Sequence, residues 1–569
     1  MAKQAAAGAG KPPGTLVERA TGAAFWNAAF LPLKLLVKLL TSIIVVRTLR
    51  GDGFAVVTQL TALLSVLGAF TDLGLERALP RFIPEFEMTT GRAGLNRLLR
   101  GVVLVKVAVM LPFVLALIVF PTLITEQLGI TTTSARLLPG APRGVDAAPL
   151  LLSIIALMLI LGAASDISIQ VLYAYFRQKM TNSLDLLNTL LIPGLQALLV
   201  LPLKVYGALL ALLVGTTISV VVSLRLMFHA LTEEHAGLRQ HPPRSPAGGP
   251  RRPSNRPVWQ RFTAYSAMMY VMNLSAALFD SSFVILMLGL LVVSDARRIV
   301  EVAVIGMAFK FVRQLLQGLV VPLTGVQTPL FARLYAEGRI EGLQTAYASL
   351  TRFLILALLP AGVGLMLMVR NLLVLLYLQI DKDAVLDASR LEQTVIACAI
   401  LTIGLFGESM ISVALNVLMV YEDYQAVLIA RAFALLVIPL LILLEPPLGV
   451  VGVAGAVALP ALTARLVALL FGVRRLGLRF PLAFLGRVAL ATLAFVVIIG
   501  PLTLLVPANP VPIFSLSWFG LALADGLLVL GAAGLFWLAF RRLGGLLDED
   551  KQRFAGMRLP GIKLLLRYL

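Results

Sequence analysis

The sequence has very few of the residues from which metal, redox and catalytic sites are usually built. Its 569 residues include one cysteine, Cys398, and three histidines, His229, His235 and His241. One thiol can form neither an internal disulfide nor a cysteine-based metal site. The histidines lie in or beside a single polar segment, which excludes a histidine triad or a zinc site within an apolar span. We therefore expect no metal and no cofactor.

Charged residues are also scarce. They make up 14% of the chain, against about 25% in a soluble domain, whereas 59% of the residues are hydrophobic. Apolar runs of about 20 residues, the length that crosses a bilayer, recur at 107–125, 147–165 and 488–509. The chain has no Gly-x-x-x-x-Gly-Lys-Ser/Thr loop for ATP and no long loop to house a catalytic site. The sequence predicts an all-α polytopic membrane protein that is not an enzyme.

The net charge of +19 reflects Lys and Arg residues that lie between apolar runs. A nucleic-acid-binding surface would need them on a water-exposed domain, so we expect no nucleic-acid partner. Basic residues beside membrane helices stay on the cytoplasmic side, and here they gather in the terminal segments and in the loops on the same side. We predict a multi-pass protein of the plasma (inner) membrane with both termini in the cytoplasm.

Apolar runs bounded by charge, Pro and Gly predict fourteen transmembrane helices, an even number that places both termini on one side. The predicted spans are 24–46, 54–76, 102–124, 149–172, 185–202, 206–229, 262–290, 300–324, 348–369, 391–419, 425–444, 449–472, 486–506 and 515–540.

A segment rich in Pro and Arg, 232–257, separates the first six spans from the rest and is predicted to be a flexible cytoplasmic linker. The segments 78–100 and 328–352 share the order Pro, Arg, acidic residue, Gly-Arg, which suggests two parallel repeats. We predict two pseudo-symmetric six-helix bundles and an extra helix pair. The predicted parts are a cytoplasmic N-terminal segment (1–23), a first lobe (24–231), the linker (232–257), a second lobe (258–473), the pair (474–542) and an amphipathic tail (543–569).

Four predicted spans carry polar side chains along one face. A charge at the bilayer centre costs about 2.5 to 3.5 kcal/mol, so it generally faces a cavity or a charged partner. Spacings of three, four and seven residues place such side chains on one side of a helix. The residues are Asn27, Lys34 and Lys38 in the first span; Asp72 and Glu76 in the second; Ser266, Asn273 and Asp280 in the seventh; and Lys310, Arg313, Gln314 and Gln317 in the eighth.

Our hypothesis is a water-filled cavity whose cations attract an anionic group. The expected substrate-binding residues are Lys34, Lys38, Lys310, Arg313, Asn27, Asn273, Gln314 and Gln317; the expected coupling or charge-balancing residues are Asp72, Glu76, Asp280 and Glu408. The alternative is that these groups form structural ion pairs or extend to the membrane surface. Arg431 and Arg465 either face the cavity or mark helix ends, and Lys106 is interpreted as extending to the membrane surface.

The run 45–86 resembles the first hairpin of polysaccharide and oligosaccharide-lipid flippases of the multidrug/oligosaccharidyl-lipid/polysaccharide exporter superfamily. That pattern has an Arg-x-Leu step, a Gly-Phe or Gly-Tyr helix start, Asp-Leu-Gly-Leu and a basic exit. The matching residues are Arg47, Gly53, Phe54, Asp72 to Leu75, and Arg81.

The resemblance implies alternating access by two bundles that export an oligosaccharide or polysaccharide repeat unit on polyprenyl phosphate or diphosphate. Its implied partners are this lipid-linked saccharide, membrane lipids and glycan-assembly proteins. Two alternatives stay open: a peptidoglycan-precursor lipid flippase of the same superfamily, and a cation-coupled multidrug antiporter. In the antiporter, Asp72, Asp280 or Glu408 would be essential and the lysines dispensable. The sugar, the coupling ion and the oligomeric state are not determined by these patterns.

Overall fold

The structure is a computed structural model, and it describes residues 16–130, 146–175, 177–240, 257–292, 295–336, 340–379, 385–421, 423–505 and 515–545. Within these ranges the chain forms helices joined by short connections, with one isolated bridge between Leu378 and Leu386. The helices are α1 (Leu16–Thr71), α2 (Leu75–Val119), α3 (Pro121–Gln127), α4 (Ala148–Ala174), α5 (Gln178–Gln240), α6 (Val258–Leu278), α7 (Ser281–Leu291), α8 (Asp295–Ala336), α9 (Ile340–Leu376), α10 (Leu391–Ile411), α11 (Val413–Val420), α12 (Tyr424–Ala432), the 3-10 helix η1 (Phe433–Leu436), α13 (Val437–Leu448), α14 (Val450–Leu476), α15 (Leu482–Leu504) and α16 (Leu516–Arg542).

Two of the long helices are pairs of spans joined by a sharp reversal. The backbone of α1 leaves helical geometry at Arg50 (φ 58°, ψ −166°), and that of α5 does so at Lys204 (φ 48°, ψ −121°). Of the described helices, ten are long and apolar enough to cross a membrane, or eleven if the bent pair α6–α7 is one span. When α1 and α5 are divided at these reversals and α8 is included, the described helices match the fourteen predicted spans one to one. The predicted fold class is confirmed.

The expected common face of Asp72 and Glu76 is wrong, because the helix ends between them. α1 stops at Thr71 and α2 starts at Leu75. The connecting residues Leu73 (φ 50°) and Gly74 (φ 67°) adopt left-handed backbone conformations that interrupt the helix. Spacing of four residues places side chains together only where a helix is continuous.

The predicted seventh span is likewise broken. α6 and α7 meet at an angle of 60°, and Asp280 lies at the break. Its side chain caps α7 by accepting a hydrogen bond from the Ser282 backbone N–H at 2.8 Å. The expected stripe through Ser266, Asn273 and Asp280 therefore stops at Asn273, because Asp280 belongs to the start of a differently directed helix.

Other boundaries also differ from the prediction. α1 starts at Leu16, before the predicted first span, and α5 continues to Gln240, so the first part of the predicted linker is helical. The exit segment 78–100 is helical too, with a kink at Gly91 (φ 64°). Residues 241–256, 1–15 and 546–569, which make up most of the predicted linker, N-terminal segment and tail, lie outside the described residues.

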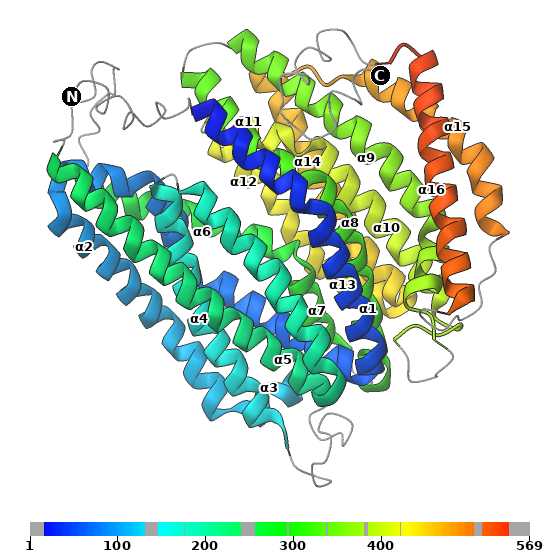
Figure 1. Cartoon of the computed structure of the whole chain (residues 1–569), viewed down its shortest axis with the longest axis horizontal. Helices are drawn as coiled ribbons and strands as arrows, with labels where there is room; N and C mark the ends of the chain where they lie inside the picture. The colour runs from blue at the N-terminus through cyan, green and yellow to red at the C-terminus, as the bar shows by residue number, and fades with distance from the viewer. Residues whose placement is uncertain are drawn as a thin grey trace, which may run out of the picture.

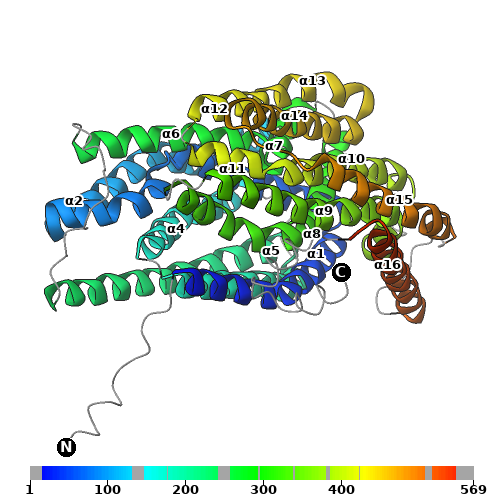
Figure 2. The same cartoon turned by 90° about the horizontal axis from the view of Figure 1, so that it is seen from above.

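We call α1–α5 the first half, α6–α14 the second half, and α15–α16 the terminal pair. Figure 1 shows α2, α4 and α5 on one side of the molecule, α9, α10, α15 and α16 on the other, and the first span of α1 between them. Figure 2 shows α12, α13 and α14 on the face away from α1 and α5. The start of α1 and the end of α16 lie at the same end of the molecule, which we call the terminal end.

The core passes through both halves, because α1 packs against α5 and also against α7 and α8. Leu60 in α1 and Val312 in α8 are fully buried in the same apolar cluster. Large apolar side chains point outward elsewhere: Leu516 is 90% exposed and Leu530 is 70% exposed. Such a surface suits lipid and would be unfavourable in water.

Two tight turns in the two halves have the same sequence pattern and backbone. Residues 202–207 read PLKVYG, and residues 447–452 read PLGVVG. The third residue has φ 48° and ψ −121° at Lys204, and φ 54° and ψ −133° at Gly449. The first turn joins the two spans of α5, and the second joins α13 to α14. We propose on this basis that spans five and six of the first lobe correspond to spans eleven and twelve of the second.

The last residue of each turn must be glycine for the same steric reason. A Cβ atom on Gly207 would lie 1.9 Å from the carbonyl oxygen of Leu199, and one on Gly452 would lie 2.0 Å from that of Leu444. No side chain fits at either distance, so in each turn glycine allows the two antiparallel helices to approach closely. Sequence, backbone and packing thus agree between the two turns.

Candidate functional site

A cavity of about 180 Å³ in the second half contains three arginines and one carboxylate in its wall. The remaining lining is apolar and comes from α6, α10, α11, α12 and α14. We call it the arginine cavity; its lining residues are Ala276, Phe279, Arg313, Leu405, Glu408, Leu415, Ala430, Arg431, Ala464 and Arg465.

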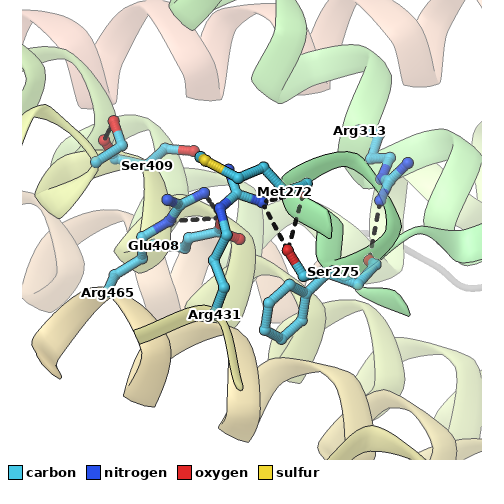
Figure 3. A network of polar contacts seen from close by, with 9 residues as sticks. Met272, Ser275, Arg313, Glu408, Ser409, Arg431 and Arg465 are labelled. Carbon is cyan, nitrogen blue, oxygen red and sulfur yellow. Dashed lines mark hydrogen bonds and ion pairs between the residues drawn. The ribbon is translucent and has the colours of Figure 1, made fainter. Parts of the chain in front are cut away.

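Arg313 projects from α8 toward the break between α6 and α7 (Figure 3). Its Nη1 donates to Asp280 Oδ2 at 2.5 Å, and its Nη2 donates to the Phe279 carbonyl oxygen at 3.3 Å. The interrupted helix thus supplies both acceptors, since a helix end leaves carbonyl groups without intrahelical partners. The break in the seventh span thereby fixes Arg313 at the cavity wall.

Arg465 on α14 pairs with Glu408 on α10 (Figure 3). Its Nε and Nη2 both donate to Glu408 Oε1, at 2.8 Å and 2.5 Å. The two side chains are 21% and 18% exposed, so this ion pair is shielded from water more than a surface pair would be. One arginine of the cavity is therefore balanced by the carboxylate of the lining.

Among the described residues, Arg431 on α12 has only neutral hydrogen-bond acceptors. Its Nη1 donates to the Met272 carbonyl oxygen at 3.0 Å and lies 3.5 Å from Ser275 Oγ on α6. Its Nε is buried and has no hydrogen-bond partner among the residues that the structure describes. A buried guanidinium N–H without an acceptor is unfavourable, so this group is available to an incoming anion.

The cavity therefore has more positive than negative charge. Arg313 and Arg465 each face one carboxylate, whereas Arg431 faces none within ion-pair distance in the described parts of the chain. A guanidinium offers a planar fork of N–H donors that matches two phosphate oxygens. The site can bind a phosphate-type anion. In the described ranges, no three His, Cys, Asp or Glu side chains are grouped so that they could hold a metal ion.

The structure brings together three of the predicted residues, Arg313, Asp280 and Glu408. It also places Arg431 and Arg465 in the same cavity, which the sequence alone left undecided. Both were visible in the sequence as arginines inside apolar spans, and such residues generally face a cavity or a partner. Which other helices they meet could not be deduced from spacing along one helix.

Several predicted residues stay outside the arginine cavity. Lys38 and Lys310 neither line it nor form a hydrogen bond or ion pair with a described residue. Gln314, next to Arg313, has a buried side-chain oxygen with no hydrogen-bond partner in the described part of the chain. The side chains of Asn27 and Gln317 lie outside the described residues. The roles of these five residues stay predictions.

Two other predicted residues have partners elsewhere. Lys34 of α1 forms an ion pair of 2.5 Å with Asp185 of α5, inside the first half. Asn273 of α6 donates to Asp72 Oδ2 at 2.6 Å, and so joins the second half to the turn between α1 and α2. These contacts fit the structural alternative for Lys34 and Asn273 better than a role in the arginine cavity.

Glu76 belongs to a second buried polar group. Its carboxylate lies 2.6 Å from Lys106 Nζ, and the two side chains are 6% and 5% exposed. Asp166 on α4 is close enough to both residues to interact with them electrostatically. The interpretation that Lys106 extends to the membrane surface is wrong, because the buried carboxylate holds its ammonium group inside the first half.

The family model for polysaccharide biosynthesis proteins matches residues 23–335, which is more than half of the chain. The chain belongs to this polysaccharide biosynthesis protein family. The resemblance predicted from the first hairpin is therefore confirmed. No curated protein matches the chain significantly.

Solved structures of two membrane transporters share the fold. One is the lipid II flippase MurJ in an inward closed conformation, with 15% identity, coverage of 90% of this chain and 98% of that chain, and a TM-score of 0.62. The other is an inward-facing multidrug resistance MATE family transporter of the MOP superfamily, with 15% identity, coverage of 78% and 94%, and a TM-score of 0.56. The chain therefore has the fold of a multi-pass membrane transporter.

Proposed function

We propose that this protein is a flippase for a lipid-linked saccharide. Its substrate is an oligosaccharide or polysaccharide repeat unit on polyprenyl phosphate or diphosphate, which it moves across the plasma membrane by alternating access. The family and the fold support export in polysaccharide biosynthesis. The excess of arginine over carboxylate in the arginine cavity is the observation that supports this substrate.

The phosphate of the substrate would bind between Arg431 and Arg465. Arg431 supplies the guanidinium that has no carboxylate partner, and Arg465 exchanges Glu408 for a phosphate oxygen. Because Glu408 competes for the same N–H groups, binding stays reversible, as transport requires. The saccharide would extend into the space between the lobes 24–231 and 258–473, with the lipid chains in the bilayer.

Alternating access requires that contacts between the two halves break. At the end of the molecule away from the chain termini, Ser42 of α1 and Tyr377 after α9 share a hydrogen bond of 3.2 Å. Arg47 Nε donates to the Leu376 carbonyl oxygen at 2.9 Å. These contacts close that end, so the substrate would enter from the terminal end. The basic loops would place the terminal end in the cytoplasm, and export would then run outward.

The buried group of Glu76, Lys106 and Asp166 is proposed to couple transport to a cation. With Asp72 nearby, it contains more carboxylates than basic groups, so binding of a proton would reduce its charge. Asp280 and Glu408 would balance the arginines. Transport would be driven by a cation gradient or by consumption of the product outside.

The test is translocation of a fluorescent polyprenyl-diphosphate oligosaccharide in proteoliposomes. We expect Arg313→Ala to reduce the initial rate by about tenfold or more, because it removes a cation from the wall of the arginine cavity. Lys310→Ala tests the role predicted for Lys310 from the sequence, and a similar loss would place this lysine on the transport path. The control is Arg370→Ala, which removes an exposed ion pair with Glu392 at 3.1 Å and should leave the rate unchanged.

Two other outcomes would replace the proposal. Transport of lipid II alone, with no transport of other carriers, would indicate the peptidoglycan-precursor flippase. Transport of organic cations that needs Asp72, Asp280 or Glu408 but neither Lys310 nor Arg313 would indicate a multidrug antiporter. No transport by the unaltered protein of any polyprenyl-linked saccharide would reject the lipid-linked substrate.

A further inference from the structure

A second basic cavity lies away from the arginine cavity, at the reversals of α1 and α5. It has a volume of about 450 Å³, and its wall includes three basic residues and one acidic residue. Arg50 and Lys204 are exposed there. We call it the reversal cavity; its lining residues are Arg47, Thr48, Leu49, Arg50, Asp52, Gly53, Lys204 and Val205.

Two of its basic residues occupy backbone conformations that favour glycine. The described residues include three non-glycine residues with positive φ, and two of them, Arg50 (φ 58°) and Lys204 (φ 48°), line this cavity. In the matching turn of the second half, the place of Lys204 is taken by Gly449. A side chain kept in an unfavourable conformation suggests a function for that side chain.

A third basic residue is fixed in place by the second half. Arg47 Nε and Nη2 donate to the carbonyl oxygens of Leu376 and Leu375 at the end of α9. Its guanidinium therefore has a defined position between the halves, next to the two exposed cations. Among the described lining residues, three are basic and one, Asp52, is acidic, in a cavity that is open to solvent.

We propose that the reversal cavity binds a phosphate or diphosphate group at the membrane surface away from the chain termini. The site shares no lining residue with the arginine cavity. Resting on the flippase function proposed above, its ligand would be the diphosphate of the lipid-linked product once that product has crossed. A free anion has the same phosphate chemistry, and the experiment separates the two sources.

The experiment uses the full chain in detergent and measures binding of inorganic pyrophosphate, with chloride of equal ionic strength as reference. We expect pyrophosphate to raise the Tm of the unaltered protein. The Lys204→Gly variant should have an equal or higher Tm without pyrophosphate, because glycine suits φ 48°, and should bind pyrophosphate about tenfold or more weakly. A loss of folding therefore cannot explain the loss of binding.

The matched control is Leu73→Gly. Leu73 (φ 50°) has the same type of backbone conformation at a turn outside the cavity, so this variant should bind pyrophosphate as the unaltered protein does. Every titration is repeated with Arg431→Ala, which removes binding at the arginine cavity only. Unchanged pyrophosphate affinity in Lys204→Gly on this background, or no binding by the unaltered protein, would overturn the proposal.

Titration with farnesyl diphosphate identifies the source of the phosphate. Binding that depends on Lys204 and is about tenfold tighter than that of pyrophosphate would support a lipid-linked diphosphate; equal affinities would support a free anion. The two proposals also fail separately. Lys204-dependent binding without saccharide translocation would reject the flippase and keep this site, whereas translocation without such binding would reject this site and keep the flippase.

Discussion

The first and second halves bury polar groups of opposite charge excess. In the first half, Glu76 and Asp166 surround Lys106, and Asp72 lies at the adjoining turn. In the second half, Arg313, Arg431 and Arg465 surround Glu408. The first group contains the ion pair Glu76–Lys106, and the second contains two ion pairs, Glu408–Arg465 and Asp280–Arg313. The two groups differ in the sign of the charge that remains unpaired.

This difference teaches how one arrangement of helices can serve two ligands. Charges in a protein interior are screened weakly, so the charge that is not neutralised decides which ion is attracted. We infer that a phosphate is favoured in the second half and a proton in the first. We propose that the first half holds the coupling ion and the second half holds the substrate.

The largest expected effect tests whether the two halves move relative to each other. Ser42→Cys with Tyr377→Cys, in a Cys398→Ala background, places two thiols at a contact between the halves. A short, cleavable cross-linker that reacts with two thiols should abolish saccharide translocation, because the contact can no longer open. Cleavage of the cross-linker should restore translocation. The single-cysteine variants, treated in the same way, should keep their rates. Normal translocation by fully cross-linked protein would exclude opening at this contact.

The next effect tests the basic half. Arg431→Ala should lower kcat/KM for the saccharide by about tenfold to a hundredfold, the loss expected when a charged donor to phosphate is removed. Arg431→Lys should recover only part of the loss, since Lys keeps the charge but not the planar fork. Initial rates in proteoliposomes measure both variants. Full activity of Arg431→Ala would rule out the proposal that the second half binds the phosphate of the substrate.

A different kind of effect, on stability, tests the acidic half. Lys106→Met leaves Glu76 buried without its cation, which should lower the free energy of unfolding by about 3 kcal/mol. Thermal or denaturant unfolding in detergent measures the change. The double variant Glu76→Leu/Lys106→Met should regain most of the stability.

The double variant also tests coupling. If it is stable but its translocation no longer responds to a cation gradient, the acidic half contributes to coupling. If its translocation responds as in the unaltered protein, this ion pair is only structural. It then gives no support to the proposal that the first half holds the coupling ion.

The smallest effect concerns competition inside the arginine cavity. Glu408→Gln removes the carboxylate that occupies Arg465, so KM for the saccharide should fall by about two- to fivefold, with a lower kcat because release is slower. Glu392→Gln, in the exposed pair with Arg370, is the control and should change neither constant. A rise in KM would mean that Glu408 orients Arg465 for binding and does not compete with the substrate.

Features that depend on neighbouring residues along the chain could be predicted from the sequence. Long apolar runs specify fourteen spans because a bilayer accepts only segments that satisfy their own backbone groups. The first hairpin identified the family. Helical spacing failed at Asp72 and Glu76, where Leu73 and Gly74 interrupt the helix, and at Asp280, which caps a new helix. Apolarity extends across such breaks and does not reveal them.

The sequence by itself determined the membrane class, the number of spans and the presence of buried charges. Only the tertiary structure decided how those charges are paired. Arg465 meets Glu408, 57 positions away, and Lys34 meets Asp185, 151 positions away. Arg431 lines a cavity because α12 packs against α6. The physical reason is that the cost of burying a charge is set along one helix, whereas its partner is set by which helices pack together.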